Sequence, residues 1–463
     1  MKTLKRINPS DEQLTIIKRV RAGVELVRGA AGSGKTTTAV MKLKMFLLWF
    51  RSQRRRDGNS EPIRALVLTY NKTLRGYVDE LVAENIQSSD ISITVDTFSR
   101  WAYQSLQKRN ICNDEAIKGY AILGLPNVNL PLEFATAEAI YAMGRFLPEN
   151  IEEYLTCRRD GRGATPRVDR QTRQAILDHI IRPYQAWKNI NGVSDWNDLA
   201  VELVTSKIHD YEIIIVDETQ DFTANYIRAI LNQLSANGVA TLVIDTAQRI
   251  YTGGFTWSEV GLTIRPENSH RLSVNYRNTP EIAQLAASLL SCVSLDDDGT
   301  PPLLDEMSGG DKPKIIKGYF RDQVSWALQY IEKNVDLSVD SVAFLHPKGW
   351  FDFLKKRLNS AGVDYIEITG LSDWPEDEVN VALSTLHSAK GLDFDYVFLI
   401  GLDKKGFPEG DYELGDDRFE HACRLLSMAI ARARKGVVIG YKEGEQPELL
   451  ARFDPSYYDE VVL

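Results

Sequence analysis

The sequence predicts an α/β protein built on parallel, doubly wound sheets, and three observations lead to this fold class. A strand-like run at 24–27 leads into a glycine-rich loop at 29–36, and a helix-compatible run follows at 37–50. Further strand-like runs alternate with helical stretches, as in parallel sheets with helical crossovers. One of these strands, at 212–216, ends in two adjacent carboxylates. Sheets of this kind hold ligands at the ends of their strands, so the functional residues are expected there.

The glycine-rich loop has the pattern G-x-x-x-x-G-K-T, which is typical of phosphate binding. Its glycines let backbone N–H groups turn inward around phosphate oxygens, and the N-terminus of the following helix adds positive potential. Lys35 is expected to reach the β- and γ-phosphates, and the Thr36 hydroxyl to hold Mg²⁺. A glycine-rich turn arising by chance is the alternative, and the flanking strand and helix argue against it. The loop therefore predicts that the chain binds a nucleoside triphosphate.

Length and composition describe an ordinary soluble globular protein of several domains. At 463 residues the chain is too long for one core, so two to four domains are expected. Its 43% hydrophobic and 26% charged residues are typical of such proteins. A net charge of −9 argues against general adhesion to nucleic acid but leaves room for a local basic track.

The cysteines and the apolar runs indicate the compartment. The four cysteines lie far apart and form no C-x-x-C pair, which argues against a zinc site or a disulfide framework and favours a reducing compartment. The first residues lack the apolar run of a signal peptide. The most apolar helix candidate, 39–50, carries two lysines and is too short to span a bilayer. We therefore expect a cytoplasmic protein without a membrane segment.

Two strand ends carry the acidic and amide groups that phosphoryl transfer needs. Asp217 and Glu218 follow the strand 212–216, where Asp217 suits the Mg²⁺ site and Glu218 could polarise the attacking water. A charged strand end without function is the alternative. Another strand ends before Asp245, and Gln248 close behind it could sense the γ-phosphate or its water.

Other segments of the first half offer candidate contacts at strand ends. The strands at 65–70 and 91–95 deliver a group of polar and aromatic residues to the expected ligand edge, although Phe98 could equally be a core residue. These residues are Tyr70, Asn71, Thr97 and Phe98. Ser10 and Gln13 form a capping box at a helix start, and Gln13 is also placed to contact adenine. The stretch 51–62 is expected to be an exposed loop.

The alternation of strands and helices stops between 105 and 195, which are expected to be mainly helical. Within this part, 157–174 holds six arginines against two aspartates. A solvated loop and an arginine-rich arm over a polyanion are equally supported interpretations. A second α/β pattern begins near residue 270 and has no phosphate loop of its own. A pair of such lobes can place a nucleotide in the cleft between them.

Taken in order, these segments resemble the motifs of superfamily 1 helicases of the UvrD/Rep/PcrA type. The resemblance runs from Asn8 to about Lys435, nearly the whole chain, in the motif order of the family. An ordered set of this kind is far more specific than one motif. The matching segments are Gln13 (Q-motif), 29–36 (I), 68–72 (Ia), 95–98 (Ib), 216–221 (II), 245–251 (III), 275–277 (IV), 385–394 (V) and 425–434 (VI).

The resemblance implies two RecA-like P-loop NTPase domains with ATP and Mg²⁺ between them and single-stranded nucleic acid across their tops. The first domain would comprise 1–104 and 196–268, with a helical insertion at 105–195, and the second would comprise 269–463. Tyr276 would stack on adenine. Arg277 and Arg432 would be arginine fingers from the second lobe, a device that stabilises charge on the transferring phosphoryl group.

The resemblance also assigns residues by position. The catalytic set is Lys35, Asp217, Glu218, Gln248, Arg277 and Arg432, with Thr36 and Asp217 as metal ligands. The nucleotide-binding set is Gln13, Gly29, Ala30, Ala31, Gly32, Ser33, Gly34, Lys35, Thr36, Thr37, Tyr276, Arg277, Gly391, Asp393 and Arg432. The nucleic-acid-binding set is Tyr70, Asn71, Thr97, Phe98, Tyr251, Trp257 and His387.

The chain departs from the family pattern at several positions. Gly253 stands where an aromatic residue often stacks on a base, so Phe255 or Trp257 would take over that contact, or the grip would be weaker. Ile244 replaces a usual Gly, and Ala431 replaces a usual Thr. About 110 residues separate Arg277 from His387, too few for the large second-lobe insertion of full-length members.

The sequence therefore predicts a compact, DNA-dependent ATPase that acts as a 3′-to-5′ translocase or helicase. The polarity and the preference for DNA over RNA come from the resemblance, and RNA stays open as the track. So compact a chain is expected to act as an oligomer or with a protein partner such as a nuclease. The alternative is an ATP-gated nucleic-acid-binding switch within a larger defence or repair complex, without processive unwinding.

Overall fold

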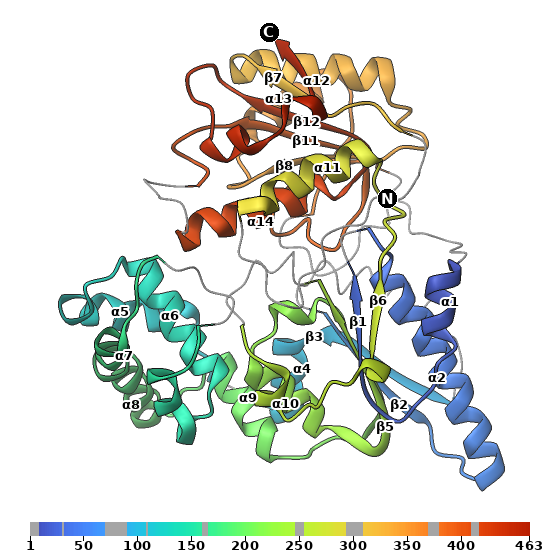
Figure 1. Cartoon of the computed structure of the whole chain (residues 1–463), viewed down its shortest axis with the longest axis vertical. Helices are drawn as coiled ribbons and strands as arrows, with labels where there is room; N and C mark the ends of the chain where they lie inside the picture. The colour runs from blue at the N-terminus through green and yellow to red at the C-terminus, as the bar shows by residue number, and fades with distance from the viewer. Residues whose placement is uncertain are drawn as a thin grey trace.

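The computed structural model describes residues 9–29, 32–69, 90–107, 110–159, 165–245, 254–292, 309–368, 379–408 and 416–463. Two α/β lobes lie one above the other along the long axis of the molecule, and a helical insertion lies beside the lower, first lobe (Figure 1). This arrangement confirms the predicted fold class of two parallel-sheet domains.

The first lobe contains a six-stranded parallel sheet in the order β3-β2-β4-β5-β1-β6. Its central strands are almost fully apolar because helices cover both faces, which is the usual pattern of a parallel sheet. The strands are β1 (Gly23–Gly29), β2 (Ile63–Thr69), β3 (Ile91–Thr97), β4 (Tyr211–Val216), β5 (Leu234–Ile244) and β6 (Ser269–Leu272). Because β6 pairs with β1, the first sheet extends four residues past the expected boundary at 268.

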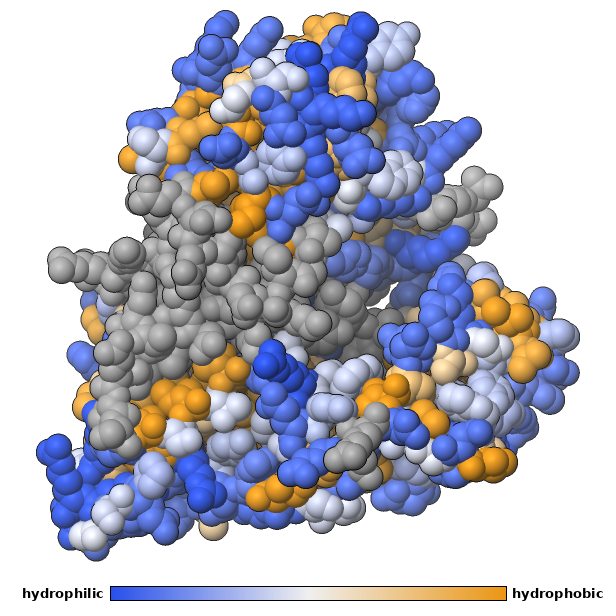
Figure 2. Space-filling view, turned by 180° about the vertical axis from the view of Figure 1, so that it is seen from behind, coloured by the Kyte–Doolittle hydropathy of each residue, from blue (hydrophilic) through white to orange (hydrophobic). Residues whose placement is uncertain are grey.

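Helices α1 (Asp11–Ile17) and α2 (Lys35–Asp57) cover one face of this sheet. The other face is covered by α4 (Phe98–Leu106), α9 (Trp196–Thr205) and α10 (Ala224–Asn232). The prediction of a loop over 51–62 is wrong for its first part, because α2 continues through Asp57. Gly58 ends the helix with a φ of +65°. Three arginines in its last turn suit the negative end of the helix dipole, and this end is the strongly hydrophilic projection at the lower left of Figure 2.

The insertion is mainly helical, as expected, and has a core of its own. Its helices are α5 (Asp114–Val128), α6 (Leu132–Arg145), α7 (Arg170–Ile176) and α8 (Arg182–Asn191), with a 3-10 helix η1 (Pro148–Leu155) and a π-helical turn η2 (Leu177–Ile181) joining α7 to α8.

The arginine-rich stretch at 157–174 fits neither of its two interpretations completely. Arg159 forms a buried ion pair with Glu138 at 2.9 Å between its Nε and the carboxylate. Arg173 donates to the carbonyl oxygens of Tyr154 and Cys157 at 2.8 and 2.7 Å. These two arginines are structural and fix the insertion, whereas Arg158, Arg167 and Arg170 are exposed.

The second lobe contains a seven-stranded parallel sheet in the order β13-β7-β12-β11-β8-β10-β9. The strands are β7 (Lys314–Lys317), β8 (Val342–His346), β9 (Ile366–Glu367), β10 (Val381–Thr385), β11 (Phe394–Leu402), β12 (Ala433–Tyr441) and β13 (Asp459–Val462). Helices α11 (Pro280–Ser288) and α14 (Asp417–Ile430) cover one face, and α12 (Phe320–Asn334) and α13 (Asp352–Ser360) cover the other.

Short 3-10 helices complete the chain. They are η3 (Thr219–Asp221), η5 (Trp257–Val260), η6 (Pro266–Asn268), η7 (Leu289–Cys292), η8 (Glu448–Arg452) and η9 (Pro455–Tyr457). Across the described ranges, no helix has the length and apolar character that crossing a membrane requires. On the face seen in Figure 2, the coloured surface of both lobes is mostly hydrophilic, with apolar patches between polar groups.

Candidate functional site: a nucleotide site between two lobes

The glycine-rich loop connects β1 to α2 and is packed tightly against the second half of the chain. Gly32 and Gly34 have φ values of +80° and +75°, which favour glycine. A Cβ on Gly32 would lie 2.1 Å from Oδ1 of Asn275, so the close approach also requires a glycine there. Gly29 ends β1, and Ser33 is buried. Ala30 and Ala31 lie outside the described residues.

Gln13 joins helix α1 to this loop. Its side chain accepts from the N–H of Ser10 in the capping box and donates from Nε2 to the carbonyl oxygen of Ser33 at 3.0 Å. A Cβ on Gly34 would lie 2.3 Å from the same Nε2. Gln13 therefore holds the conformation of the loop, and its contact with adenine stays a prediction.

Lys35 and Thr36 at the start of α2 face acids at the ends of two neighbouring strands. Nζ of Lys35 lies 3.0 Å from Oδ2 of Asp245, which follows β5. The Thr36 hydroxyl donates to Oδ2 of Asp217, which follows β4, at 2.7 Å. A hydroxyl and a carboxylate oxygen at one point are ligands that suit Mg²⁺, so these two residues fit the expected metal. Thr37 follows them in the first turn of α2.

Asp217 and Glu218 are both buried, but their surroundings separate their pKa values. Burial and the neighbouring Glu218 raise the pKa of Asp217 to about 6. Burial also acts to raise the pKa of Glu218, but the charges of Lys390, Lys35 and Arg432 outweigh it and hold that pKa below its ordinary value. Glu218 is therefore ionised at neutral pH, in the form that can accept a proton from water.

The backbone of Glu218 is in the left-handed region, at φ +53°. This conformation costs a non-glycine residue about 1–2 kcal/mol. Gln220 stabilises the turn by donating to the Glu218 carboxylate and accepting from the N–H of Asp245 at 2.9 Å. Backbone strain of this kind is concentrated at functional sites, where the fold determines the conformation.

Lys390 reaches this acidic cluster from the second lobe. It lies between β10 and β11, forms an ion pair with Asp221 and lies 3.6 Å from Oε2 of Glu218. Sequence reasoning assigned no role to Lys390 or to its ion-pair partner Asp221. Their positions inside the segments 385–394 and 216–221 were the signal that could have found them.

Three arginines of the second lobe gather around Asp393, which precedes β11. Nε of Arg277 lies 2.8 Å from Oδ1 of Asp393, and Arg434 lies 3.3 Å from Oδ2. Arg432 is buried, and burial together with the charge of Arg277 lowers its pKa to about 10, against the opposing effect of Asp393. It is still cationic at neutral pH. Gly391 lies in the same connection, with a φ of +82°.

The strand connection 273–278 brings these arginines to the glycine-rich loop. The N–H of Tyr276 donates to the carbonyl oxygen of Gly32 at 3.0 Å, and the Tyr276 ring is 43% exposed. Asn278 donates to the carbonyl oxygen of Ala431 at 3.0 Å, one residue before Arg432. Tyr276 therefore contacts the phosphate loop directly, and Asn278 links the same connection to the segment that carries Arg432. The nucleotide contacts expected of Tyr276, Arg277 and Arg432 stay predictions.

The expected nucleic-acid contacts are less well assembled. Phe98 is a correction, because it is 3% exposed and stacks on Tyr226 with 3.8 Å between ring centroids. Its core alternative therefore describes its position, because Trp101, Phe222 and Tyr226 surround the ring. Thr97 caps α4 by accepting from the N–H of Arg100. His387 packs 5.9 Å from the His421 ring, and burial together with Lys390 lowers its pKa.

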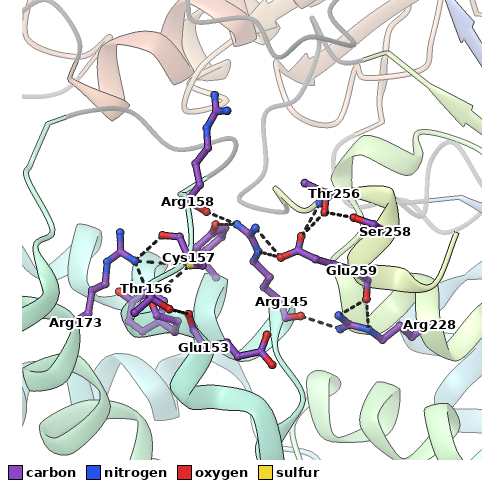
Figure 3. Close-up of polar contacts among 12 residues, drawn as sticks. Arg145, Glu153, Thr156, Cys157, Arg158, Arg173, Arg228, Thr256, Ser258 and Glu259 are labelled. Atoms are coloured by element: carbon purple, nitrogen blue, oxygen red, sulfur yellow. Dashed lines mark hydrogen bonds and ion pairs between the residues drawn. The ribbon is translucent and has the colours of Figure 1, made fainter. Parts of the chain in front are cut away.

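Trp257 is half-buried in η5, the 3-10 helix whose Glu259 joins the first lobe to the insertion. Its ring meets that of Phe255 edge-on at 5.5 Å. Figure 3 shows the network around the adjacent Glu259, whose carboxylate receives Arg145 at 2.8 Å. Arg228 donates to the carbonyl oxygens of Glu259 and Arg145, at 2.9 and 2.8 Å. Tyr70, Asn71, Gln248 and Tyr251 lie outside the described residues.

Both halves of the chain match known protein families. The sequence profile of the AAA domain matches residues 13–254, and the profile of the UvrD-like helicase C-terminal domain matches residues 354–444. The first range contains the glycine-rich loop and the acidic strand ends, and the second contains Lys390, Asp393 and Arg432.

Several curated proteins are similar in sequence. A probable DNA helicase of Mycoplasma pneumoniae is 23% identical over 448 residues, which cover 89% of this chain and 79% of that protein. The ATP-dependent DNA helicase PcrA of Leuconostoc citreum is 43% identical over 68 residues, covering 15% of this chain and 9% of that protein. The ATP-dependent DNA helicase Rep of Salmonella typhimurium is 36% identical over 85 residues, covering 18% and 12%. The chain thus matches the last two over a small share of their length.

Proposed function

The chain belongs to the UvrD/Rep/PcrA family of superfamily 1, a family of ATP-dependent DNA helicases, and we propose that it moves along single-stranded DNA in the 3′-to-5′ direction while hydrolysing ATP between its lobes. The observation that carries this proposal is the junction of the two lobes. The charges of Lys35 in the first lobe and of Lys390 and Arg432 in the second all act on Glu218, so cations from both sides can surround one triphosphate.

The residues of the first lobe bind and activate. Backbone N–H groups of the loop and the ammonium group of Lys35 bind the phosphates. To do so, Lys35 leaves its ion pair with Asp245. Thr36 and Asp217 would hold Mg²⁺, which neutralises charge on the phosphate oxygens when it is bound. The ionised Glu218 orients the attacking water and accepts its proton.

The residues of the second lobe complete the site only when the lobes are together. Arg277 leaves its ion pair with Asp393 and binds phosphate oxygens instead. Arg432 adds a second positive charge from its buried position. In-trans or in-cis arginines of this kind are worth about 10³–10⁵ in rate in related phosphoryl transfers. Hydrolysis breaks the bond to the γ-phosphate, and release of that phosphate takes away negative charge that held both arginines. The lobes can then separate and the strand can advance.

The proposal is tested by steady-state ATP hydrolysis without nucleic acid, with single-stranded DNA and with single-stranded RNA. We expect stimulation by DNA, and we expect Glu218→Gln to lower the stimulated rate by about 10²–10⁴-fold. Glu443→Gln, an exposed acid in the turn that follows β12, is the matched control and should keep the wild-type rate. A rate that neither polymer changes would contradict a motor and favour an ATP-gated switch.

Polarity has its own measurement within the same proposal. Displacement of a strand from duplexes with a single-stranded 3′ or 5′ extension reports the direction of movement. We expect displacement only with the 3′ extension. Stimulated hydrolysis without displacement on either substrate would restrict the activity to translocation or clamping.

A further inference from the structure

An exposed tryptophan stands at the ligand edge of the second sheet and has no part in the nucleotide site. Trp350 follows β8, and its side chain is 61% exposed, which is unusual for so large an apolar group. Nζ of Lys348 lies over its ring, 5.1 Å from the centroid. The ring therefore presents a flat face to solvent with a cation beside it.

The loop that carries Trp350 is held by short local contacts. Nδ1 of His346 accepts from the N–H of Lys348 at 3.1 Å and from the N–H of Trp350 at 3.4 Å. Burial lowers the pKa of His346, which favours the neutral ring that can accept these bonds. The His346 ring also lies 5.6 Å from that of Trp350, and the next residue, Phe351, is buried in the core. The tryptophan is thus exposed on a fixed support.

Two further lysines lie at the neighbouring strand end. β11 is parallel to β8 and ends at Leu402, so its following loop lies at the same edge of the sheet. Asp403 shapes this loop by accepting from the N–H groups of Lys405 and Gly406 at 2.9 and 2.7 Å. The side chains of Lys404 and Lys405 are exposed, and a shallow depression joins this loop to Trp350.

On the other side, the Trp350 loop touches the strand that leads to His387. β10 pairs with β8 so that Thr385 is opposite His346. A Cβ on Gly349, which has a φ of +68°, would lie 3.4 Å from Cγ2 of Thr385. Trp350 therefore lies at the same edge as His387, the second-lobe residue that the sequence assigns to nucleic-acid binding.

We propose that Trp350 is a stacking platform for one base of the bound single strand, with Lys348, Lys404 and Lys405 contacting the adjoining phosphates. The inference rests on the proposed function and adds a site to it. A flat aromatic face with several cations around it matches the chemistry of single-stranded nucleic acid, where each base has a π-face and each link a negative charge. The platform also supplies an aromatic contact in a chain where Gly253 stands in the aromatic position and Phe98 is buried.

The test is the affinity of the full chain for a fluorescent oligo-dT strand, measured by anisotropy, and for the same strand with abasic positions. We expect Trp350→Ala to weaken oligo-dT binding by about 5- to 100-fold, the range for one base–aromatic stack. Trp350→Phe, which keeps a flat ring, should retain most of the affinity. On the abasic strand, wild type and Trp350→Ala should bind equally.

The lysines have a separate signature. Because each phosphate contact to a single strand contributes about −0.7 to the slope of log affinity against log salt, Lys404→Ala with Lys405→Ala should reduce the slope by about 1.4. Trp350→Ala should leave the slope unchanged. Tyr319→Ala is the matched control, because Tyr319 is also exposed with a lysine over its ring but lies at β7, on the far side of β11 and β12.

The outcomes separate the two proposals. Equal affinity of wild type and Trp350→Ala for oligo-dT, with DNA-stimulated hydrolysis intact, would overturn the platform and leave the motor standing. Equal losses in Trp350→Ala and Tyr319→Ala would also overturn it, since a distant ring would then serve as well. A wild-type chain that binds neither strand would overturn both proposals and assign the Trp350 surface to another partner. The unfolding midpoint of each variant shows whether it is folded.

Discussion

Lys390 of the second lobe forms an ion pair with Asp221 of the first, and both side chains are almost completely buried. The pair lies beside Glu218, so it joins the lobes at the carboxylate that we propose activates the attacking water. Removing one partner of a buried pair leaves an uncompensated charge. This contact therefore links the relative position of the lobes to the protonation of Glu218.

We expect Lys390→Met to lower the free energy of unfolding by about 3–5 kcal/mol, because it leaves the buried Asp221 carboxylate without its ion-pair partner. Lys435→Ala is the control, since its pair with Asp340 is half-exposed and should be worth about 0–1 kcal/mol. Urea titration of both variants makes the comparison. Equal, small losses would show that the Lys390 pair is not buried in solution.

The same substitution should change the pH dependence of hydrolysis. Among the neighbouring cations, Lys390 has the largest lowering effect on the pKa of Glu218. A depressed carboxylate pKa gives stability and an ionised base at higher pH, and both are lost as the pH falls through the depressed value. Without Lys390 the pKa rises, so the acid limb of the rate profile should move to higher pH. An acid limb at the wild-type position would contradict this coupling.

The pKa of Asp217 is shifted in the opposite direction from that of Glu218, so its effect on stability depends on pH in the opposite way. Its folded pKa of about 6 lies above the ordinary value of 3.8, so ionisation destabilises the fold, and the relative stability present below pH 4 is lost as the pH rises through 6. We expect Asp217→Asn, without nucleotide or metal, to be more stable than wild type at pH 7.5 by roughly 1–3 kcal/mol. The difference should vanish near pH 4, while hydrolysis is lost at every pH. A variant less stable at pH 7.5 would contradict the raised pKa.

Much of the nucleotide site could be predicted because its residues are close in sequence to strand ends. The loop before α2 and the acids after β4 are local patterns, and the structure joins them through Thr36 and Asp217. Their role in holding Mg²⁺ stays a prediction. Lys390 was missed because a lysine gives no local sign of burial, and only the packing of the lobes encloses it.

The remaining differences have physical causes of the same kind. The end of α2 has the composition of a loop, but its arginines pair with Asp90 and Glu212 across the sheet edge and extend the helix. Arg159 and Arg173 satisfy buried partners that lie elsewhere in the insertion. In each case, a long-range partner decides whether a charged side chain is solvated, and sequence spacing does not reveal that partner.

The insertion should depend on Arg145 far more than on its exposed ion pairs. Arg145 is 4% exposed and binds Glu259 and the carbonyl oxygen of Arg158. We expect Arg145→Ala to cost about 3–5 kcal/mol and to increase hydrogen exchange in η5. Arg182→Ala removes exposed pairs with Glu152 and Asp178 from the same insertion, and should cost about 0–1 kcal/mol. Exchange in η5 that stays at the wild-type rate would contradict an anchoring role.

Substitutions of Phe98 can distinguish a core role of its ring from a base-stacking role. It is enclosed by Tyr226, Phe222 and Trp101, so truncation to alanine should cost about 3–5 kcal/mol. Phe98→Leu keeps an apolar side chain of similar volume and should cost less than about 1.5 kcal/mol. Because leucine has no π-face, Phe98→Leu also reports stacking: we expect its affinity for oligo-dT to equal that of wild type. A leucine variant that is stable but binds the strand several-fold more weakly would show that Phe98 leaves the core to stack on a base, and would return it to the nucleic-acid site.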